Sequence, residues 1–221
     1  MYQTVTEELR TTYDLSAVDR DSLAISAWKQ EERQTFLELL NEEQKTTLIE
    51  IGAGPGKDSK FFQDHDLHVV STDLSPQMVQ LCRAKGLEAY VMDFLNLEFP
   101  DAHFDAVYAL NCLLHVPKVD LPRVLISIRR ILKPAGLFFM GVYGGYASEA
   151  VWEEDHLTPK RFFSFYPDDE IQAITARYFD IHDFKIITLP DPSDPEGHFQ
   201  RLILRKIRIR SHNLLGQVAV K

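Results

Sequence analysis

Three glycines at alternate positions, Gly52, Gly54 and Gly56, directly follow the apolar run Thr47–Ile51. Glycines after a buried strand let the backbone turn sharply and let a ligand approach it, and a following helix offers free N–H groups. Asp73 ends the next apolar run, where a carboxylate can accept hydrogen bonds from ribose hydroxyls. A strand, a glycine turn, a helix and this acid together predict a site for an adenosine-type cofactor.

Glu50 lies inside the apolar strand, and Lys57 occupies the position of the third glycine in the dinucleotide pattern G-x-G-x-x-G. A carboxylate in an apolar strand is costly unless a cation meets it. Beside a pyrophosphate it would add repulsion, whereas beside an ammonium and a sulfonium it would be stabilising. This favours S-adenosylmethionine over NAD. An ion pair between Glu50 and Lys57 is the alternative interpretation of the buried acid.

Two further positions extend the predicted cofactor site. Asp93 ends the third apolar run, where an acid can accept a hydrogen bond from an adenine amino group while Phe94 packs nearby. Leu74, directly after Asp73, is grouped with the same site. Taken alone, Asp93 is as well explained as a loop residue.

His115 is the best candidate for a general base. It follows the carboxyl end of the apolar run 104–110, and ligands bind at that end of the strands in open α/β sheets. Its unperturbed pKa suits proton transfer near neutral pH. A structural histidine is the alternative.

Two segments are predicted to form the acceptor side of the site: the insert 143–167 and the N-terminal helical region. Aromatic rings mixed with charges are typical of a pocket wall. The candidates are Tyr13, Trp28, Tyr143, Trp152, His156 and Arg161. Packing of a long loop and of a helix is the alternative for these segments. Consecutive positions rarely face one site, so no metal site is predicted at Glu153–His156.

These residues must be positioned by alternating strands and helices. Apolar runs predict strands at 47–51, 67–71, 88–92, 104–110, 137–142, around 184–189, and at 199–206. Helical periodicity or helix signals mark 5–9, 23–28, 31–40, 57–65, 76–85, 121–132 and 168–178, the fifth with Ser75 as its N-cap and the sixth ended by Pro134-Ala135-Gly136. The alternation predicts a mainly parallel sheet covered on both faces, with the last two strands as an antiparallel hairpin at one edge, linked by a loop at 190–197.

The predicted organisation has three parts. Residues 1–45 form a helical lid or packing region, 46–206 form the cofactor-binding domain, and 207–221 form a tail or edge segment. The 221 residues include 45% hydrophobic and 26% charged residues, the balance of a soluble globule. The net charge of −9 argues against nucleic acid as a partner, because an acidic chain repels phosphate. The basic run 201–210 alternates with apolar residues like a strand with one solvated face.

Location and assembly are predicted from what the sequence lacks. No run has the length and apolarity of a membrane span or the pattern of a signal peptide, which predicts a cytoplasmic protein that does not bind membranes. Two cysteines make no disulfide framework or zinc pattern, so both are expected to be buried. A monomer or a homodimer is expected.

Over residues 47–143 the sequence resembles the class I S-adenosylmethionine-dependent methyltransferases, in the branch of small standalone enzymes. The segments that carry the resemblance are LIEIGAGPGKDS, VVSTDLSPQMV, VMDF, FDAVYALNCLLHVP and RRILKPAGLFFM, in the order of the family. The resemblance implies a Rossmann-like, doubly wound seven-stranded sheet, mostly parallel with an antiparallel edge strand. Pro55 stands where the family often has Thr or Ser, and Ala135 where it often has Gly.

The resemblance also implies roles for residues of the turn and the strand ends. It assigns Glu50, Gly52 and Gly54 to the methionine end, Asp73 to the ribose, Asp93 with Phe94 to the adenine, and Asn111 to the vicinity of the transferable methyl. The expected function is methyl transfer from S-adenosylmethionine to a small molecule by in-line displacement. A protein-directed methyltransferase, a non-catalytic S-adenosylmethionine-binding module and an NAD-dependent oxidoreductase are the alternatives.

Overall fold

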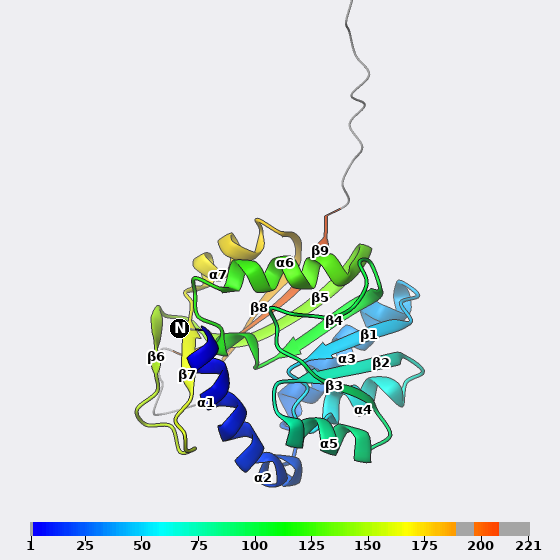
Figure 1. Ribbon diagram of the computed structural model, residues 1–221. Helices are drawn as coiled ribbons and strands as arrows, with labels where there is room; N and C mark the ends of the chain where they lie inside the picture. The colour runs from blue at the N-terminus through cyan, green and yellow to red at the C-terminus, as the bar shows by residue number, and fades with distance from the viewer. Residues whose placement is uncertain (1, 189–196, 208–221) are drawn as a thin grey trace, which may run out of the picture.

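The computed structural model describes residues 2–188 and 197–207 and consists of one large sheet, helices on both of its faces, and a small two-stranded sheet (Figure 1). The strands of the large sheet are β1 (Thr47–Ile51), β2 (His68–Asp73), β3 (Glu88–Val91), β4 (Phe104–Leu110), β5 (Leu132–Gly144), β8 (Phe179–Ile187) and β9 (His198–Lys206). The small sheet pairs β6 (Ser148–Val151) with β7 (Phe162–Phe165). The helices are α1 (Tyr2–Leu15), α2 (Ala17–Ser22), α3 (Ala27–Glu42), α4 (Lys57–Gln63), α5 (Pro76–Ala84), α6 (Leu121–Ile131) and α7 (Asp168–Thr175), with a short 3-10 turn at Leu113–His115.

The strand order is β3-β2-β1-β4-β5-β9-β8. The first five strands pair in parallel, and β9 runs antiparallel to both of its neighbours. The predicted doubly wound, seven-stranded sheet with a terminal antiparallel hairpin is therefore confirmed. Within that hairpin β9 lies one place inside the edge, and β8 is the edge strand.

Apolar side chains cover the sheet on both faces because the parallel strands are buried from both sides. On one face, Phe36 of α3 and Phe62 of α4 pack against Tyr108 of β4, with ring centroids 5.9 Å and 5.0 Å from the tyrosine. On the other face, Ile128 of α6 lies in the cluster that contains Val107. Figure 1 shows α6 on one side of the sheet and α3 and α4 on the other. Helices packed on both faces therefore hold the sheet in place.

One local expectation is wrong and another is confirmed. The segment predicted as a helix at 23–28 is non-helical from Leu23 to Ser26, and it links α2 to α3. The Lys57 ammonium bonds the carbonyl oxygens of Arg20 (3.1 Å) and Leu23, which supports the end of α2 there. The helix α6 ends at Ile131, ahead of Pro134-Ala135-Gly136 as predicted, and these three residues lie near the start of β5, where Ala135 adopts φ +60°.

The insert 143–167 contains the β6–β7 ribbon, which the sequence pattern did not reveal. Ser75 caps α5 as predicted, because its Oγ accepts a hydrogen bond from the backbone N–H of Met78 at 3.1 Å. Parts of the predicted strand at 184–189, of the loop at 190–197 and of the tail at 207–221 lie outside the described residues. Among the described helices, none has the length and apolarity that crossing a membrane requires.

Residues 2–26, which comprise α1, α2 and the link to α3, are referred to below as the N-terminal cover. Thr12 Oγ1 donates to the carbonyl oxygen of Pro159 at 2.6 Å, and Asp21 pairs with Lys85 at 2.8 Å. Asp14 accepts hydrogen bonds from the Ser75 hydroxyl and from the backbone N–H of Gln77. These contacts attach the cover to the domain at several separate points.

Candidate functional site

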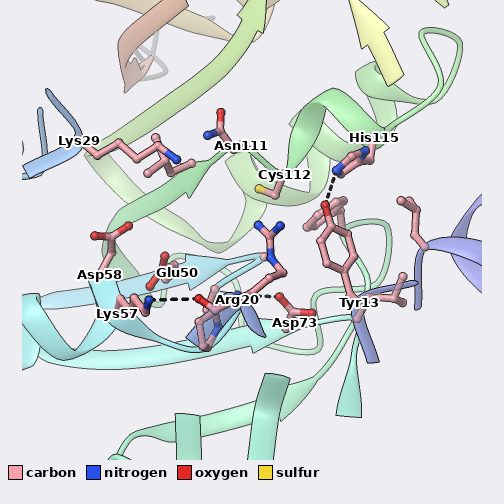
Figure 2. A pocket seen from close by; sticks show the side chains of 18 of the residues that line it. Tyr13, Arg20, Lys29, Glu50, Lys57, Asp58, Asp73, Asn111, Cys112 and His115 are labelled. Atoms are coloured by element: carbon pink, nitrogen blue, oxygen red, sulfur yellow. Dashed lines mark hydrogen bonds between the residues drawn. The ribbon is translucent and has the colours of Figure 1, made fainter. Parts of the chain in front are cut away.

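A cavity of about 250 Å³ lies at the carboxyl ends of β1, β2 and β4 and is covered by the N-terminal cover (Figure 2). The sheet side contributes the glycine turn and the residues that follow β2 and β4. The opposite wall comes from the cover and the start of α3, and it includes Leu9, Tyr13, Arg20 and Lys29. The cavity is the crevice in which open α/β sheets bind their ligands.

Gly52 and Gly54 are required to be glycine for different structural reasons. Both have a positive φ, +64° at Gly52 and +54° at Gly54. A Cβ at Gly52 would lie 2.4 Å from the Cβ of Cys112, so packing against the loop after β4 demands glycine there. A Cβ at Gly54 would meet no atom within 4 Å. Gly54 therefore keeps a strip of backbone open toward the cavity, where a ligand can approach closely.

Glu50 is 3% exposed and lines this cavity. One of its oxygens, Oε2, accepts a hydrogen bond from the Ser59 hydroxyl, which in turn accepts one from the Ser71 hydroxyl at 2.8 Å. Burial raises the pKa of the Glu50 carboxyl well above its usual range, and the nearby charge of Asp58 raises it further. The alternative of an ion pair with Lys57 is not realised, since Lys57 bonds backbone carbonyls of the cover.

Asp73 organises the turn from the neighbouring strand. Its Oδ2 accepts from the backbone N–H of Gly54 at 2.8 Å and its Oδ1 from that of Ser75 at 2.9 Å. Burial raises its pKa, while these two hydrogen bonds act in the opposite direction. A carboxylate has about four acceptor positions, so two remain for hydroxyl donors in the cavity. Leu74 lines the cavity beside it.

Asp93 and Phe94 also line the cavity. Asp93 Oδ1 accepts hydrogen bonds from the backbone N–H groups of Leu95 (2.7 Å) and Asn96 (3.0 Å). One carboxylate oxygen of Asp93 therefore stabilises the loop after β3, as the alternative interpretation of this residue requires. The other oxygen has no hydrogen bond among the described residues.

Asn111 follows β4 in a left-handed backbone conformation, with φ +55°. Its N–H donates to the carbonyl oxygen of Gly141 at 2.8 Å, which fixes the residue at the end of the strand. Its side-chain oxygen is buried and has no hydrogen-bond partner among the described residues, and the residue lines the cavity. A buried orphan acceptor calls for a donor. Together with the buried Glu50 carboxylate, Asn111 suits a ligand that carries an ammonium group.

Tyr13 and His115 join the cover to the sheet across the cavity. Their Oη and Nε2 atoms lie 2.6 Å apart (Figure 2). His115 Nδ1 lies 2.7 Å from the carbonyl oxygen of Phe162. A carbonyl oxygen only accepts, so Nδ1 carries the proton and the Tyr13 hydroxyl donates to Nε2. Burial lowers the pKa of His115 to about 3, so the ring is neutral at physiological pH.

Arg161 supports this pair from the far side of the cavity wall. Its Nη1 lies 3.4 Å from Tyr13 Oη, and its guanidinium binds Asp155 through two contacts of 2.7 Å and 2.9 Å. Burial raises the pKa of Asp155, but the hydrogen bonds from Arg161 outweigh burial and lower it to about 2. Arg161 therefore positions Tyr13 without lining the cavity.

Several predicted residues are placed away from the cavity. Trp28 and Tyr143 both pack on the ring of Phe199, at centroid distances of 4.5 Å and 5.5 Å. Trp152 lines a second cavity, and the His156 side chain is 82% exposed. These four residues do not meet the cofactor candidates. Gly56 also lies outside the lining, where its missing Cβ makes room for Leu87 and Cys82.

The cavity also contains charged residues that sequence reasoning did not select. They are Arg20, Lys57 and Asp58, and Lys29 at the start of α3 lines the cavity with them. Lys57 was considered only as the residue in place of a glycine and as an ion-pair partner of Glu50. Arg20 belongs to a region expected to be helical, and only the fold brings it over the glycine turn. Asp58 pairs with Arg33 at 2.9 Å.

A doubly wound sheet with a glycine turn after β1 and a buried acid ending β2 defines an α/β protein that binds a nucleoside-type ligand. Residues 49–140 match the family described as "Methyltransferase domain". Over this segment, which runs from β1 into β5, the chain resembles the S-adenosylmethionine-dependent methyltransferases.

Relatives of this chain include proteins with several acceptors in their names. The chain is 30% identical over 139 residues to probable tRNA methyltransferase 9B of Homo sapiens, an alignment that covers 62% of this chain and 29% of the relative. It is 29% identical over 160 residues to phosphoethanolamine N-methyltransferase 1 of Arabidopsis thaliana, with 69% and 29% covered. The chain thus spans less than a third of the length of these curated relatives.

Among solved structures, the chain resembles the 1,6-didemethyltoxoflavin-N1-methyltransferase of Burkholderia thailandensis, whose crystal structure holds 1,6-didemethyltoxoflavin and S-adenosylhomocysteine. The TM-score is 0.71 at 19% identity, and the alignment covers 94% of this chain and 91% of that one. At this identity the likeness establishes the fold.

Proposed function

We propose that this protein binds S-adenosylmethionine and transfers its methyl group to a small-molecule acceptor. The observation that carries the proposal is the buried Glu50 carboxylate, which lines the cavity beside the unpartnered Asn111 oxygen. Two buried acceptors at one cavity call for a donor, and a cationic donor also compensates the carboxylate, whereas a pyrophosphate would be repelled by it. An amino acid ammonium joined to a nucleoside fits both requirements.

The other cofactor contacts are assigned from the remaining acceptors. Asp73 has free acceptor positions for two ribose hydroxyls while it holds the turn through Gly54. Asp93 and Phe94 line the adenine end, and Gly54 leaves its backbone open. When bound, the cofactor supplies an electrophilic methyl group on a sulfonium. The sulfur leaves as a neutral thioether, so the enzyme has little charge to stabilise.

The protein's main task is alignment. Orientation and the prior loss of translational freedom can contribute about 7–11 kcal/mol to such a displacement. The N-terminal cover supplies the wall that holds an acceptor against the turn and excludes water. Leu9 and Tyr13 form part of that wall.

His115 is proposed as the base for an acceptor that must lose a proton. Its ring is neutral, and its Nε2 is reached through the Tyr13 hydroxyl that lines the same cavity. A proton from the acceptor can pass to the Tyr13 oxygen as the phenol proton passes to Nε2. Such assistance is worth about 10²- to 10⁴-fold in rate for a base whose pKa lies near the working pH, and the lowered pKa of His115 reduces it here.

A small acceptor is favoured because the cover closes the cavity on the side away from the sheet. The net charge of −9 also disfavours tRNA, although one relative is named for it. The phosphoethanolamine and toxoflavin relatives are named for small acceptors. None of these names identifies the acceptor of this chain.

The proposal is tested first by calorimetric titration with S-adenosylhomocysteine and with NAD. We expect heat with the former only. Asp73→Asn should weaken S-adenosylhomocysteine binding by about 1–3 kcal/mol, roughly 5- to 150-fold, whereas Asp66→Asn, at an exposed turn, should leave it unchanged. Unchanged affinity in Asp73→Asn would limit that residue to a structural role.

A second step uses methyl-labelled cofactor with metabolite, tRNA and protein fractions. Label in the metabolite fraction supports the proposal. Label only in tRNA or protein would overturn the acceptor class, and binding without any transfer would identify a non-catalytic binding module. Heat with NAD alone would overturn the cofactor assignment.

A further inference from the structure

The β6–β7 ribbon carries a second cavity, of about 240 Å³, at the side of the molecule where Figure 1 shows the ribbon beside α1. Its lining shares no residue with the first cavity. The register pairs Ser148 with Phe165 and Ala150 with Phe163. Side chains alternate along a strand, so Phe163 and Phe165 project from one face of the ribbon, over the small Ala150 and Ser148.

Aromatic rings form the walls of this second cavity. The rings of Phe163 and Phe165 lie 5.6 Å apart with planes only 25° from parallel. The Trp152 ring stands nearly perpendicular to both, at 84° and 85°, with centroid distances of 5.3 Å and 6.4 Å. Tyr146 closes another side, 5.3 Å from Phe165 and tilted by 55°. Four rings in at least two orientations thus surround one space.

Acidic side chains complete the lining. Glu153 and Glu154 both line this cavity. The Lys160 ammonium binds Glu153 at 2.7 Å, whereas Glu154 has no hydrogen bond or ion pair among the described residues. The Phe163 ring is buried and already faces the Arg161 guanidinium at 5.1 Å, so Trp152 and Phe165 are the rings that offer faces to a ligand, beside the carboxylate of Glu154.

Aromatic ring faces together with a carboxylate favour a cationic ligand. The face of an aromatic ring carries negative electrostatic potential and attracts a cation within about 6 Å of its centroid. An anion is repelled by both the rings and Glu154, and a purely apolar ligand makes no use of the carboxylate. A small metal ion would need more carboxylate or imidazole ligands than this lining offers, and no group of three or more metal-ligating side chains occurs among the described residues.

We propose that the cavity on the β6–β7 ribbon binds the methylated ammonium group of a small organic cation. Methyl groups spread the charge over a large, weakly hydrated surface that fits between flat rings. Trp152 and Phe165 supply ring faces, and Glu154 supplies the counter-charge. This site is separate from the proposed methyl-transfer cavity, so it stands or falls independently of that function.

The test uses Trp152 as its own reporter. The chain has two tryptophans, so Trp28→Phe leaves Trp152 as the sole indole. Its emission is titrated with choline and with 3,3-dimethylbutanol, the uncharged compound of the same shape, at constant ionic strength. We expect saturable quenching with choline and a much smaller effect with the alcohol.

Variants in that background locate the site. Phe165→Leu removes one ring and should weaken choline binding roughly two- to fivefold, the usual contribution of one exposed cation–π contact. Glu154→Gln, at an exposed position, should weaken it as well without affecting folding. Tyr90→Leu is the matched control, because Tyr90 is 41% exposed like Trp152 but lies on β3. It should leave choline binding unchanged.

Two results would overturn the proposal. Equal quenching by choline and by the alcohol would make the cavity an apolar crevice without charge selectivity. Quenching that does not saturate, or that is unaffected by both Phe165→Leu and Glu154→Gln, would place the cation elsewhere. Circular dichroism of each variant checks that the fold is intact, so that loss of binding reports on the cavity.

Discussion

Glu50→Gln should change stability and ligand binding in opposite directions. In the ligand-free protein the Glu50 carboxyl accepts hydrogen bonds from the hydroxyl and from the backbone N–H of Ser59, but no cation among the described residues pairs with it. A glutamine can keep the Ser59 bond and place its amide nitrogen toward the cavity. It removes a buried charge at the same time, and a poorly satisfied buried acceptor costs about 1–3 kcal/mol. We expect a gain in stability of that order at pH 7.5.

The gain should depend on pH in a defined direction. Burial raises the pKa of the Glu50 carboxyl in the folded protein. The contribution of this carboxyl to the free energy of unfolding is therefore fully present below the unfolded-state pKa of about 4.5, and it is lost as pH rises through the folded-state pKa. The melting temperature of Glu50→Gln should therefore match that of the wild type at low pH and exceed it near neutrality. A gain of 1 kcal/mol corresponds to about 2–4 °C at this size.

Ligand binding should suffer in the same variant. A charge-assisted hydrogen bond to an ammonium is worth about 1.5–3 kcal/mol, so S-adenosylhomocysteine should bind roughly 10- to 150-fold more weakly. Scanning calorimetry from pH 4.5 to 8 and isothermal titration measure both effects, with the exposed Glu42→Gln as control. A variant that is destabilised at every pH, or that binds as tightly as the wild type, would falsify the assignment of Glu50.

Other expectations follow from individual contacts. Gly52→Ala should destabilise the fold more than Gly54→Ala, because only the first Cβ meets an atom. Gly54→Ala should cost only the left-handed backbone strain of about 1–2 kcal/mol in melting experiments yet weaken S-adenosylhomocysteine binding. Glu32→Gln should cost about 1.5–3 kcal/mol in chemical denaturation, because it removes the charge that the buried Arg201 guanidinium contacts at 3.0 Å and leaves Asp183 as its carboxylate partner. Unchanged stability would contradict this. The pKa of His115 is about 3, so titration of this ring should add no inflection to the pH dependence of the methyl-transfer rate near neutral pH. The pH profiles of the wild type and of His115→Ala, measured from pH 6 to 7, should therefore have the same shape.

The sequence predicted those features that depend on neighbours along the chain. The strand, glycine turn and helix at 47–63 form one local unit, and the alternation of such units gives the parallel sheet. The positions of Gly52, Gly54 and Asp73 around one cavity follow from strand order alone. The fold was therefore recognisable before the structure.

Features that depend on distant contacts could not be predicted. Tyr13 and His115 are 102 positions apart, and only the docking of α1 shows that one bonds the other. The unwinding at Leu23 depends on Lys57, a residue of a different element. Trp152 was predicted to form part of a pocket wall, and it does line a cavity, but this cavity lies on the β6–β7 ribbon and not at the glycine turn. A pattern of residue types does not say which of two cavities a ring will face.

The attachment of the N-terminal cover has a kinetic consequence. Thr12, Asp14, Tyr13 and the Asp21–Lys85 pair hold it at separate points, and a net hydrogen bond contributes about 0.5–1.5 kcal/mol. Opening would thus cost several kcal/mol, so the open form would be a minor population. A nucleoside ligand would then bind and dissociate only while the cover is open, so the association and dissociation rate constants would fall by the same factor. Shortening the chain at α1 should accelerate exchange in both directions more than it changes the dissociation constant.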